Sequence, residues 1–362
     1  MTSRERFLKA LNFQEPDYVP VFANLTPQLA EKLGKEMNLP YEPEDSFLST
    51  RNSHTEILLE LGNDGVGIAA CREIPTKTLE NGTIKDEWGI IYKQVGFYTE
   101  AIIRPLAHVE TIEQLDQYRI PDPLAPSRWE LAEKMVKKYS KDYAIIGDLE
   151  ATMYELAWNL VGMEKFIMDM AMGKDYVFEL LDRLMDFNLT CAKRMINLGA
   201  DMIWTGDDVG TQKGMMMSPA MWRQVLKPRM KKMFDEMKKE NPNIKIAYHS
   251  CGSIVPIIED LIEIGLDVLN PIQPLAKGMD LALFKKKYGD KLVFFGGVDV
   301  QDVLPHGTTE DVEAEVRRRI QAAAKGGGFI IAPAHNIQPD TSIENIKAFF
   351  RAVKKYGKYP IQ

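Results

Sequence analysis

The chain has 362 residues, of which 45% are hydrophobic and 27% charged, with a formal net charge of −7, an ordinary globular composition. Its basic runs are no longer than a solvated helix face and no stretch approaches about 18 apolar residues, so we expect neither a nucleic-acid partner nor a membrane partner. Three widely separated cysteines and an N-terminus without the apolar core of a signal peptide predict a cytoplasmic protein, while the oligomeric state stays open, a homodimer included.

Eight short apolar runs end in polar or glycine residues and are the predicted strands. They cover residues 19–23, 65–70, 143–149, 201–208, 244–252, 268–274, 291–299 and 328–336. From the third run onward, consecutive runs are separated by enough chain for a helix and short loops, which is the alternation of a parallel sheet. Eight such units without a GxGxxG motif after the first favour an α/β fold of the (β/α)8, or TIM, barrel type over a doubly wound sheet. We expect one catalytic domain over residues 1–362.

One segment interrupts this alternation. Residues 86–106 place aromatic and β-branched side chains around glycines, which predicts a β-hairpin inserted near the N-terminus, over one edge of the barrel mouth. Helix signals are clear elsewhere. Residues 253–265 open with Ser253 as a candidate cap, residues 308–325 open with Thr308 followed by acids, and residues 227–239 carry apolar side chains at helical spacing.

Chemistry in a barrel is expected where strands lead into the loops that follow them. The predicted strand ends carry the polar residues Asp148, Glu150, Asp207, Asp208, His249, Cys251, Asn270, Gln273, Asp299, Gln301, His335, Asn336 and Gln338. Several of these side-chain types bind soft divalent metals. The sequence therefore predicts an active site that gathers at the C-terminal ends of the strands.

The pair His249 and Cys251 is the sharpest feature. Residues two apart on a strand point to the same side, so the imidazole and the thiol are expected to face one point. Zinc accepts nitrogen and thiolate ligands together, and a catalytic zinc site needs three protein ligands and an open position. We expect His335, at another strand end, to be the third ligand, with Asp207 or Asp208 as alternatives. The competing interpretation is a packed histidine and a buried thiol.

The remaining candidates divide into acids and ligand-binding residues. Asp207 and Asp208 are adjacent at a strand end, and we expect at least one of them to be a functional acid while the other caps a helix or ties down a loop. Glu150 is a further candidate acid. Met215 and Met216 lie in a loop after the fourth strand, where soft apolar side chains suit a flat ligand. We assign cofactor binding to these two methionines together with the polar residues Gln273, Asp299 and Asn336.

Taken together, these segments resemble the uroporphyrinogen decarboxylase superfamily over nearly the whole chain. The resemblance rests on SRERFLKALNFQEPDYVPV, DEWGIIYK, TGDDVGTQKGMMMSP, YHSCGSI, NPIQP, FFGGVD and APAHNIQPDTS. It implies a (β/α)8 barrel. True uroporphyrinogen decarboxylases carry an arginine-bearing segment of the type RQAGR near the N-terminus, which grips the substrate's carboxylates. The corresponding residues 21–30 contain no arginine, so decarboxylation of that substrate is not expected.

The cobalamin-dependent methyltransferases are the branch that this chain resembles most. In that branch a His-x-Cys motif on the fifth strand binds zinc with a further cysteine from the last strand. His249 and Cys251 match the motif, whereas the last cysteine is absent and His335 stands in its neighbourhood. This departure leaves the third ligand open and weakens assignment to the members that methylate coenzyme M.

The resemblance implies the first methyltransferase of an O-demethylase system. Such an enzyme takes a methyl group from an aromatic methyl ether and passes it to cobalamin bound on a separate corrinoid protein. Zinc as a Lewis acid, or an acid such as Asp207 or Glu150, meets the need to polarise the ether oxygen. The chain has no D-x-H-x-x-G corrinoid motif of its own. Two alternatives stand beside this: a zinc-independent decarboxylase or lyase using Asp207 and His249, and a non-catalytic barrel that binds a ligand or partner.

Overall fold

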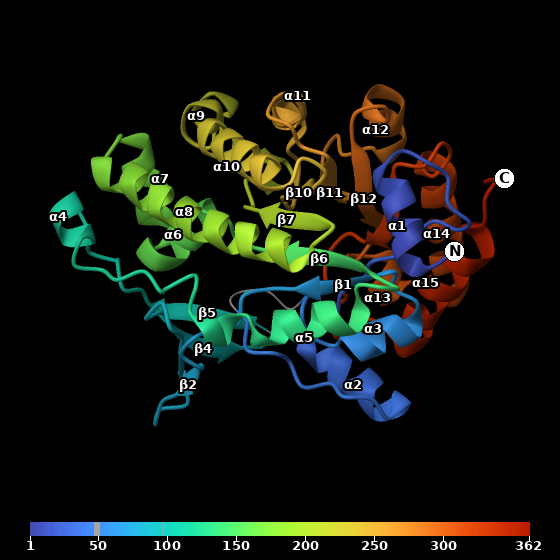
Figure 1. The fold of residues 1–362 in the computed structure, drawn as a ribbon, viewed down its shortest axis with the longest axis horizontal. Helices are drawn as coiled ribbons and strands as arrows, with labels where there is room; N and C mark the ends of the chain where they lie inside the picture. Colours follow the sequence, from blue (N-terminus) through green and yellow to red (C-terminus); the bar gives the residue numbers. More distant parts are fainter. Residues whose placement is uncertain (47–50, 97) are drawn as a thin grey trace.

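The computed structural model describes residues 1–46, 51–96 and 98–362, and its centre is a curled parallel sheet (Figure 1). Seven strands lie in the order β1, β6, β7, β10, β11, β12 and β13. Their bounds are Gly65–Ile68, Ala144–Asp148, Met202–Gly206, Lys245–His249, Val268–Ile272, Val293–Val298 and Phe329–Pro333. Each lies within one of the predicted runs, and helices connect them around the outside. The predicted α/β barrel class is confirmed.

The first predicted strand, residues 19–23, is not a regular strand. Its segment is extended and lies between β13 and β1, but it pairs with β13 through an isolated bridge of Val21 to Ile331. Pro20 has no amide hydrogen to donate to a ladder. On the β1 side, the amide of Val21 donates to the Asp64 side chain at 2.9 Å, and that of Ala23 to Asn63 at 2.9 Å. Side chains thus replace part of the backbone ladder between this segment and β1, alongside the backbone bond from the Asp64 amide to the Val21 carbonyl at 2.8 Å. The segment fills the gap between β13 and β1.

Fifteen α-helices are described around the sheet and at its ends. They are α1 (Ser3–Leu11), α2 (Pro27–Met37), α3 (Thr55–Leu61), α4 (Ile112–Leu115), α5 (Glu130–Tyr139), α6 (Tyr154–Val161), α7 (Met163–Ala171), α8 (Asp175–Leu198), α9 (Pro219–Val225), α10 (Lys227–Glu240), α11 (Ile258–Glu263), α12 (Leu281–Tyr288), α13 (Val303–His306), α14 (Thr309–Ala323) and α15 (Ile343–Tyr356). Within the described residues, no helix combines the length and the apolar character that crossing a bilayer requires.

Two of the three predicted helices, over 227–239 and 308–325, begin and end close to where they were predicted. α10 buries Met230, Met233, Phe234 and Met237, and α14 starts with a capping box between Thr308 and Asp311. The helix predicted over 253–265 starts later, because Ser253 donates its hydroxyl to the Lys277 carbonyl at 2.6 Å instead of capping. A short 3-10 turn, Val255–Ile257, follows, and the α-helix begins at Ile258.

The insertion after β1 is larger than the predicted hairpin. Four antiparallel strands, β2 (Lys77–Thr78), β3 (Ile84–Lys85), β4 (Ile91–Val95) and β5 (Tyr98–Ile103), form a separate sheet in chain order. The predicted hairpin corresponds to β4 and β5, and the two short strands before it complete the sheet. In Figure 1 this sheet lies on the same side of the barrel as α4 and α7, at the end opposite both chain termini.

The barrel interior is filled from below by a helix. Alternate residues of the strands point inward, and Met202, Val268 and Ile330 are among those that pack there with Phe7 and Leu11 of α1. A larger apolar cluster lies between the sheet and the surrounding helices. Because the lower interior is occupied, polar inward-facing side chains collect at the upper, C-terminal ends of the strands.

Candidate active site at the barrel mouth

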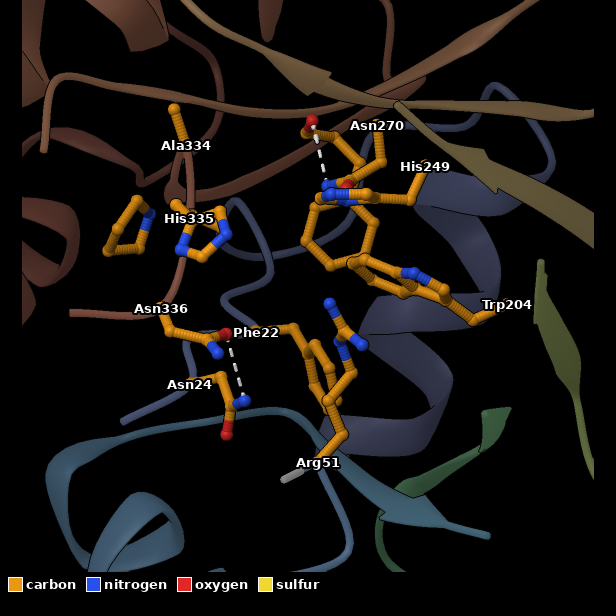
Figure 2. Close-up of a pocket in the computed structure, with 12 residues that line it drawn as sticks. Phe22, Asn24, Arg51, Trp204, His249, Asn270, Ala334, His335 and Asn336 are labelled. Atoms are coloured by element: carbon orange, nitrogen blue, oxygen red, sulfur yellow. Dashed lines mark hydrogen bonds between the residues drawn. The ribbon is translucent and has the colours of Figure 1, made fainter. Parts of the chain in front are cut away.

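A narrow pocket opens at the C-terminal ends of the strands (Figure 2). It is lined by Phe22, Asn24, Arg51, Trp204, His249, Asn270, Phe295, Ala332, Pro333, Ala334, His335 and Asn336. Its free volume is about 20 Å3, which is room for roughly one water molecule or a group of similar size. Aromatic rings form one wall and amides with a histidine form the other.

His249, the last residue of β10, is buried and held in one orientation. Its Nδ1 lies 2.6 Å from the Asn270 Oδ1 atom, while the Asn270 Nδ2 atom donates to the Phe295 carbonyl at 3.2 Å. Because the amide is a donor on its far side, its oxygen faces the ring, and His249 donates from Nδ1. The lone pair of Nε2 is therefore free to accept a proton or bind a metal.

Two side chains lie beside that lone pair. The Cys251 Sγ atom lies 3.5 Å from Nε2 of His249, and the Asp208 Oδ1 atom lies 3.7 Å from it. The ligand atoms of Asp208, His249 and Cys251 all lie within 4.8 Å of one another, and we call these three residues the metal group. In tetrahedral zinc sites, nitrogen and sulfur ligands are about 3.6 Å apart. The arrangement fits a zinc ion with an open fourth position.

His335 does not join this group, contrary to the prediction that it is the third ligand. Within the described residues, the cluster able to hold a metal contains Asp208 in its place. The His335 ring lies at the rim of the mouth, with its centre 6.3 Å from that of the His249 ring (Figure 2). The Asp208 alternative is the one that the geometry supports.

The protonation states suit a metal ligand set. Burial lowers the pKa of His249 to about 4; the Asp208 charge opposes this and the Arg51 charge adds to it. The imidazole is therefore neutral at pH 7. Burial also raises the pKa of the Cys251 thiol, and the Asp208 carboxylate raises it further. Without a cation beside it, this thiol keeps its proton, so binding of a metal releases one.

Arg51 forms the side of the pocket below the metal group. Its Nη1 atom lies 3.2 Å from an oxygen of Asp148, and it also contacts the Glu150 carboxylate. The guanidinium carbon lies 4.1 Å from the centre of the Trp204 ring, which in turn stacks at 5.9 Å on the His249 ring. Glu150, predicted as a catalytic acid, is thus an ion-pair partner of Arg51. It helps to hold that side chain in the pocket wall.

Asp207 serves α6 and does not reach the pocket. Its carboxylate is fully buried and accepts the backbone amides of Met153 at 3.2 Å and Glu155 at 2.8 Å, where α6 begins. Burial raises the pKa of Asp207 to about 7. The predicted catalytic role of Asp207 is not supported by this geometry, and the helix-capping alternative fits it.

Glu155 supports the metal group from behind. Its Oε2 atom accepts the amide of Asp208 at 3.0 Å. Burial raises the pKa of Glu155 well above its ordinary value, and the charges of Asp208 and Asp207 raise it further. Asp208 in turn accepts the amide of Cys251 at 2.7 Å, which fixes the loop after β10.

The residues predicted to bind a cofactor have different positions. Asn336 lines the pocket, and its Oδ1 atom accepts a hydrogen bond from the Asn24 Nδ2 atom at 3.0 Å. Gln273 accepts the amide of Gly252 at 2.8 Å, and Asp299 accepts that of Gln301 at 2.8 Å, so both fix loops. Met215 and Met216 lie in and just after a small hairpin of β8 (Gly210–Thr211) and β9 (Gly214–Met215), partly exposed and outside the lining.

The lining includes residues that the sequence reasoning missed. Arg51 stands in a segment without periodicity, where no sequence signal marks it. Trp204 is different, because it lies two residues after Met202 in a predicted strand and so faces the barrel interior, 4% exposed. Its indole Nε1 atom is buried and has no hydrogen-bond partner among the described residues. The alternation of inward and outward residues along this strand is the sequence signal that could have identified Trp204.

The comparisons with known proteins agree with this architecture. Residues 93–356 match the family described as "Uroporphyrinogen decarboxylase (URO-D)". The methylcobamide:CoM methyltransferase MtaA of Methanosarcina barkeri is 29% identical over 67% of this chain and 66% of that protein. The methylcobamide:CoM methyltransferase MtbA of Methanosarcina acetivorans is 24% identical over 98% of each chain.

A solved structure shares the whole fold. The structure described as a methyltransferase from Methanosarcina mazei covers 98% of this chain and 99% of its own, with a TM-score of 0.72 at 22% identity. This likeness supports the barrel fold alone. The family match extends over well more than half of the chain, which therefore belongs to the uroporphyrinogen decarboxylase (URO-D) family.

Proposed function

We propose that this chain is a zinc-dependent methyltransferase within the URO-D family, acting as one barrel domain over residues 1–362. It takes a methyl group from a small methylated donor, an aromatic methyl ether, and transfers it to the corrinoid of a separate corrinoid protein. The observation that carries the proposal is the metal group of Asp208, His249 and Cys251 beside the pocket. The names of MtaA and MtbA, both methylcobamide:CoM methyltransferases, support the corrinoid partner.

The reaction breaks the bond between the methyl carbon and the ether oxygen, which keeps the electron pair and leaves as the phenol after taking up a proton. The reduced cobalt of the partner's corrinoid supplies the electron pair for the new bond to the methyl carbon. When bound by the metal group, zinc would supply a Lewis acid for that oxygen. His249 offers a neutral, oriented nitrogen, and Cys251 and Asp208 offer the anionic ligands. Phe22, Trp204 and the rest of the aromatic wall exclude water from a space of methyl size. The aryl part of the donor lies toward the open mouth.

Metal content tests the first half of the proposal. Elemental analysis of the purified protein should give about one zinc per chain. Cys251→Ala should lose the zinc, whereas His335→Ala should keep it, because the geometry leaves His335 outside the metal group. Wild-type protein without zinc after careful preparation, or full activity of Cys251→Ala, would refute an essential zinc at this site.

Methyl transfer tests the second half. Reduced cobalamin serves as the acceptor and its methylation is followed by absorbance, with methoxylated aromatics, methanol, a methylamine and a methyl thioether as donors. An aryl methyl ether should be used best, and the reaction should vanish with the zinc of Cys251→Ala. Methylated cobalamin with a thiol tests the opposite direction, and uroporphyrinogen tests decarboxylation. Turnover confined to either of these last two assays contradicts the proposal.

A further inference from the structure

The charges around the pocket are unequal. Arg51 is the one cationic residue among the described residues that line it. Two carboxylates, Asp148 and Glu150, contact its guanidinium, and a third, Asp208, lies 3.7 Å from His249. Because the histidines are uncharged, the three carboxylates outnumber the single guanidinium, and the formal charge of these groups is negative. The segment 47–50, whose placement is not described, has the sequence Phe-Leu-Ser-Thr and carries no ionisable side chain.

A metal ion does not reverse this balance. A divalent cation adds two positive charges, but it is bound with the thiolate of Cys251, which adds a negative one. The formal charge of the site therefore stays negative in both states. The ion pair of Arg51 and Asp148 is also shielded poorly by water, since Arg51 is 6% exposed and Asp148 is 3% exposed. Charges in such surroundings act on a ligand more strongly than charges in water.

The rest of the lining is neutral and is built for hydrogen bonds and aromatic contact. Asn24 and Asn336 bond to each other at 3.0 Å on the wall opposite the aromatic rings (Figure 2). Phe22 and Phe295 lie edge to face, with ring centres 5.9 Å apart. These side chains suit the neutral methoxy end of a donor whose ring lies toward the open mouth, and they supply no counter-charge for an anion.

We infer that the site takes an uncharged methylated donor and discriminates against one that carries a carboxylate, because the charge of Arg51 is already neutralised by Asp148 and Glu150. The inference rests on the proposed function and names its substrate class: a neutral aryl methyl ether with hydroxyl or amide substituents. Arg51 then acts as part of the pocket wall, stacked on Trp204. It is not a receptor for substrate carboxylates.

A matched pair of compounds tests the inference by binding alone. 4-Hydroxy-3-methoxybenzamide and 4-hydroxy-3-methoxybenzoate have nearly the same size and differ by one charge. Isothermal titration of the zinc-loaded protein should show the amide binding at least tenfold more tightly than the benzoate. Equal affinities, tighter binding of the benzoate, or no binding of either compound at millimolar concentration would overturn the inference.

A charge variant makes the test specific to Arg51. Glu150→Gln removes one neutralising charge while keeping the shape of the side chain, so the affinity for the benzoate should rise about tenfold relative to the amide. Asp302→Asn removes an exposed charge outside the lining, and its affinity ratio should equal that of the wild type. If Glu150→Gln leaves the ratio unchanged, the charges around Arg51 do not set the preference and the inference fails.

Methyl transfer to reduced cobalamin, measured with the same two compounds, separates this inference from the proposed function. Preference for the amide in binding without transfer from any donor rejects the proposed function and leaves the charge preference standing. Transfer from both compounds with equal kcat/KM and equal affinity supports the function and rejects the inference. Circular dichroism of each variant verifies that it is folded.

Discussion

Asn270 decides which nitrogen of His249 faces the metal group. Its carbonyl oxygen holds the Nδ1 hydrogen at 2.6 Å, and partners of this kind typically account for 10–100-fold of metal affinity. We expect Asn270→Leu to weaken zinc binding by about that factor, and Asn270→Asp, which keeps an acceptor at the same place, to retain it. Competition with a chromogenic chelator measures both affinities. Equal affinities for the two variants would show that the ring is oriented by other contacts.

The thiol of Cys251 should dominate the pH dependence of zinc binding. Its pKa is raised by burial, so zinc displaces its proton, whereas His249, with a pKa lowered to about 4, has none to lose above pH 6. Zinc affinity should therefore rise about tenfold per pH unit between pH 6 and 8, one proton per ion. Chelator competition across this range gives the slope, and Cys251→Asp should flatten it. A slope of two would mean that the histidine is protonated as well.

At this scale the sequence predicted the pair His249 and Cys251, and the structure brings the two side chains together. The sequence alone did not decide whether His335 or Asp208 is the third metal ligand. Asp208 lies past the end of β7, where strand alternation no longer sets direction, and its position depends on the bonds to Glu155 and Cys251. Tertiary contacts of this kind leave no periodic trace in a sequence.

At the scale of elements, Asp207 links the end of β7 to the start of α6. Its pKa, raised to about 7 by burial, exceeds the ordinary value near 3.8, so the folded state holds a proton that the unfolded state releases. The stability that it contributes is present below pH 4 and is lost as the pH rises through 7. We expect wild-type protein to lose more free energy of unfolding than Asp207→Asn between pH 5 and 8. Urea unfolding at both pH values measures this, and parallel losses would contradict it.

The elements were predictable where local patterns decide them. Apolar runs located seven strands, and apolar spacing located α10, because burial on one face imposes a period. Other elements depended on distant partners. Ser253 bonds to Lys277, so the helix after β10 begins late, and Pro20 disrupts a ladder that only the closed barrel would form. The four-stranded insertion was underestimated because its first two strands have only two residues each.

At the scale of the whole molecule, α1 closes the bottom of the barrel while the pocket lies at the top. Phe7 is fully buried among the inward-facing strand residues. Phe7→Ala should lower the free energy of unfolding by about 3–5 kcal/mol. The zinc affinity of the folded protein should stay unchanged, because Phe7 packs against Phe22 of the pocket wall, with ring centres 6.4 Å apart, whereas the metal group lies outside the apolar cluster of Phe7. Leu8→Ala, on a half-buried neighbour, should cost less. Chemical denaturation and chelator competition measure the two quantities, and a joint loss would show that the ends are coupled.

The barrel class followed from the alternation of strands and helices, together with the family resemblance. The way in which the barrel closes could not be predicted from the sequence. It depends on the side chains of Asn63 and Asp64, which accept hydrogen bonds from amides some 40 residues earlier. Such contacts are set by the complete fold, after the strands have curled. A parallel sheet with eight runs predicts that closure occurs, and leaves open how the last gap is filled.

The seam at residues 19–25 has a consequence for motion. A place where side chains and isolated bridges stand in for a continuous ladder opens at a lower free energy than the paired strands around it. Amide hydrogens of Val21 and Ala23 should accordingly exchange with deuterium before those in the middle of β10. Phe22 and Asn24 stand on this seam and also line the pocket, whose resting volume is small. We therefore expect the barrel to widen most easily beside its site, so that opening along this edge would admit the donor while the metal group on the opposite strands stays fixed.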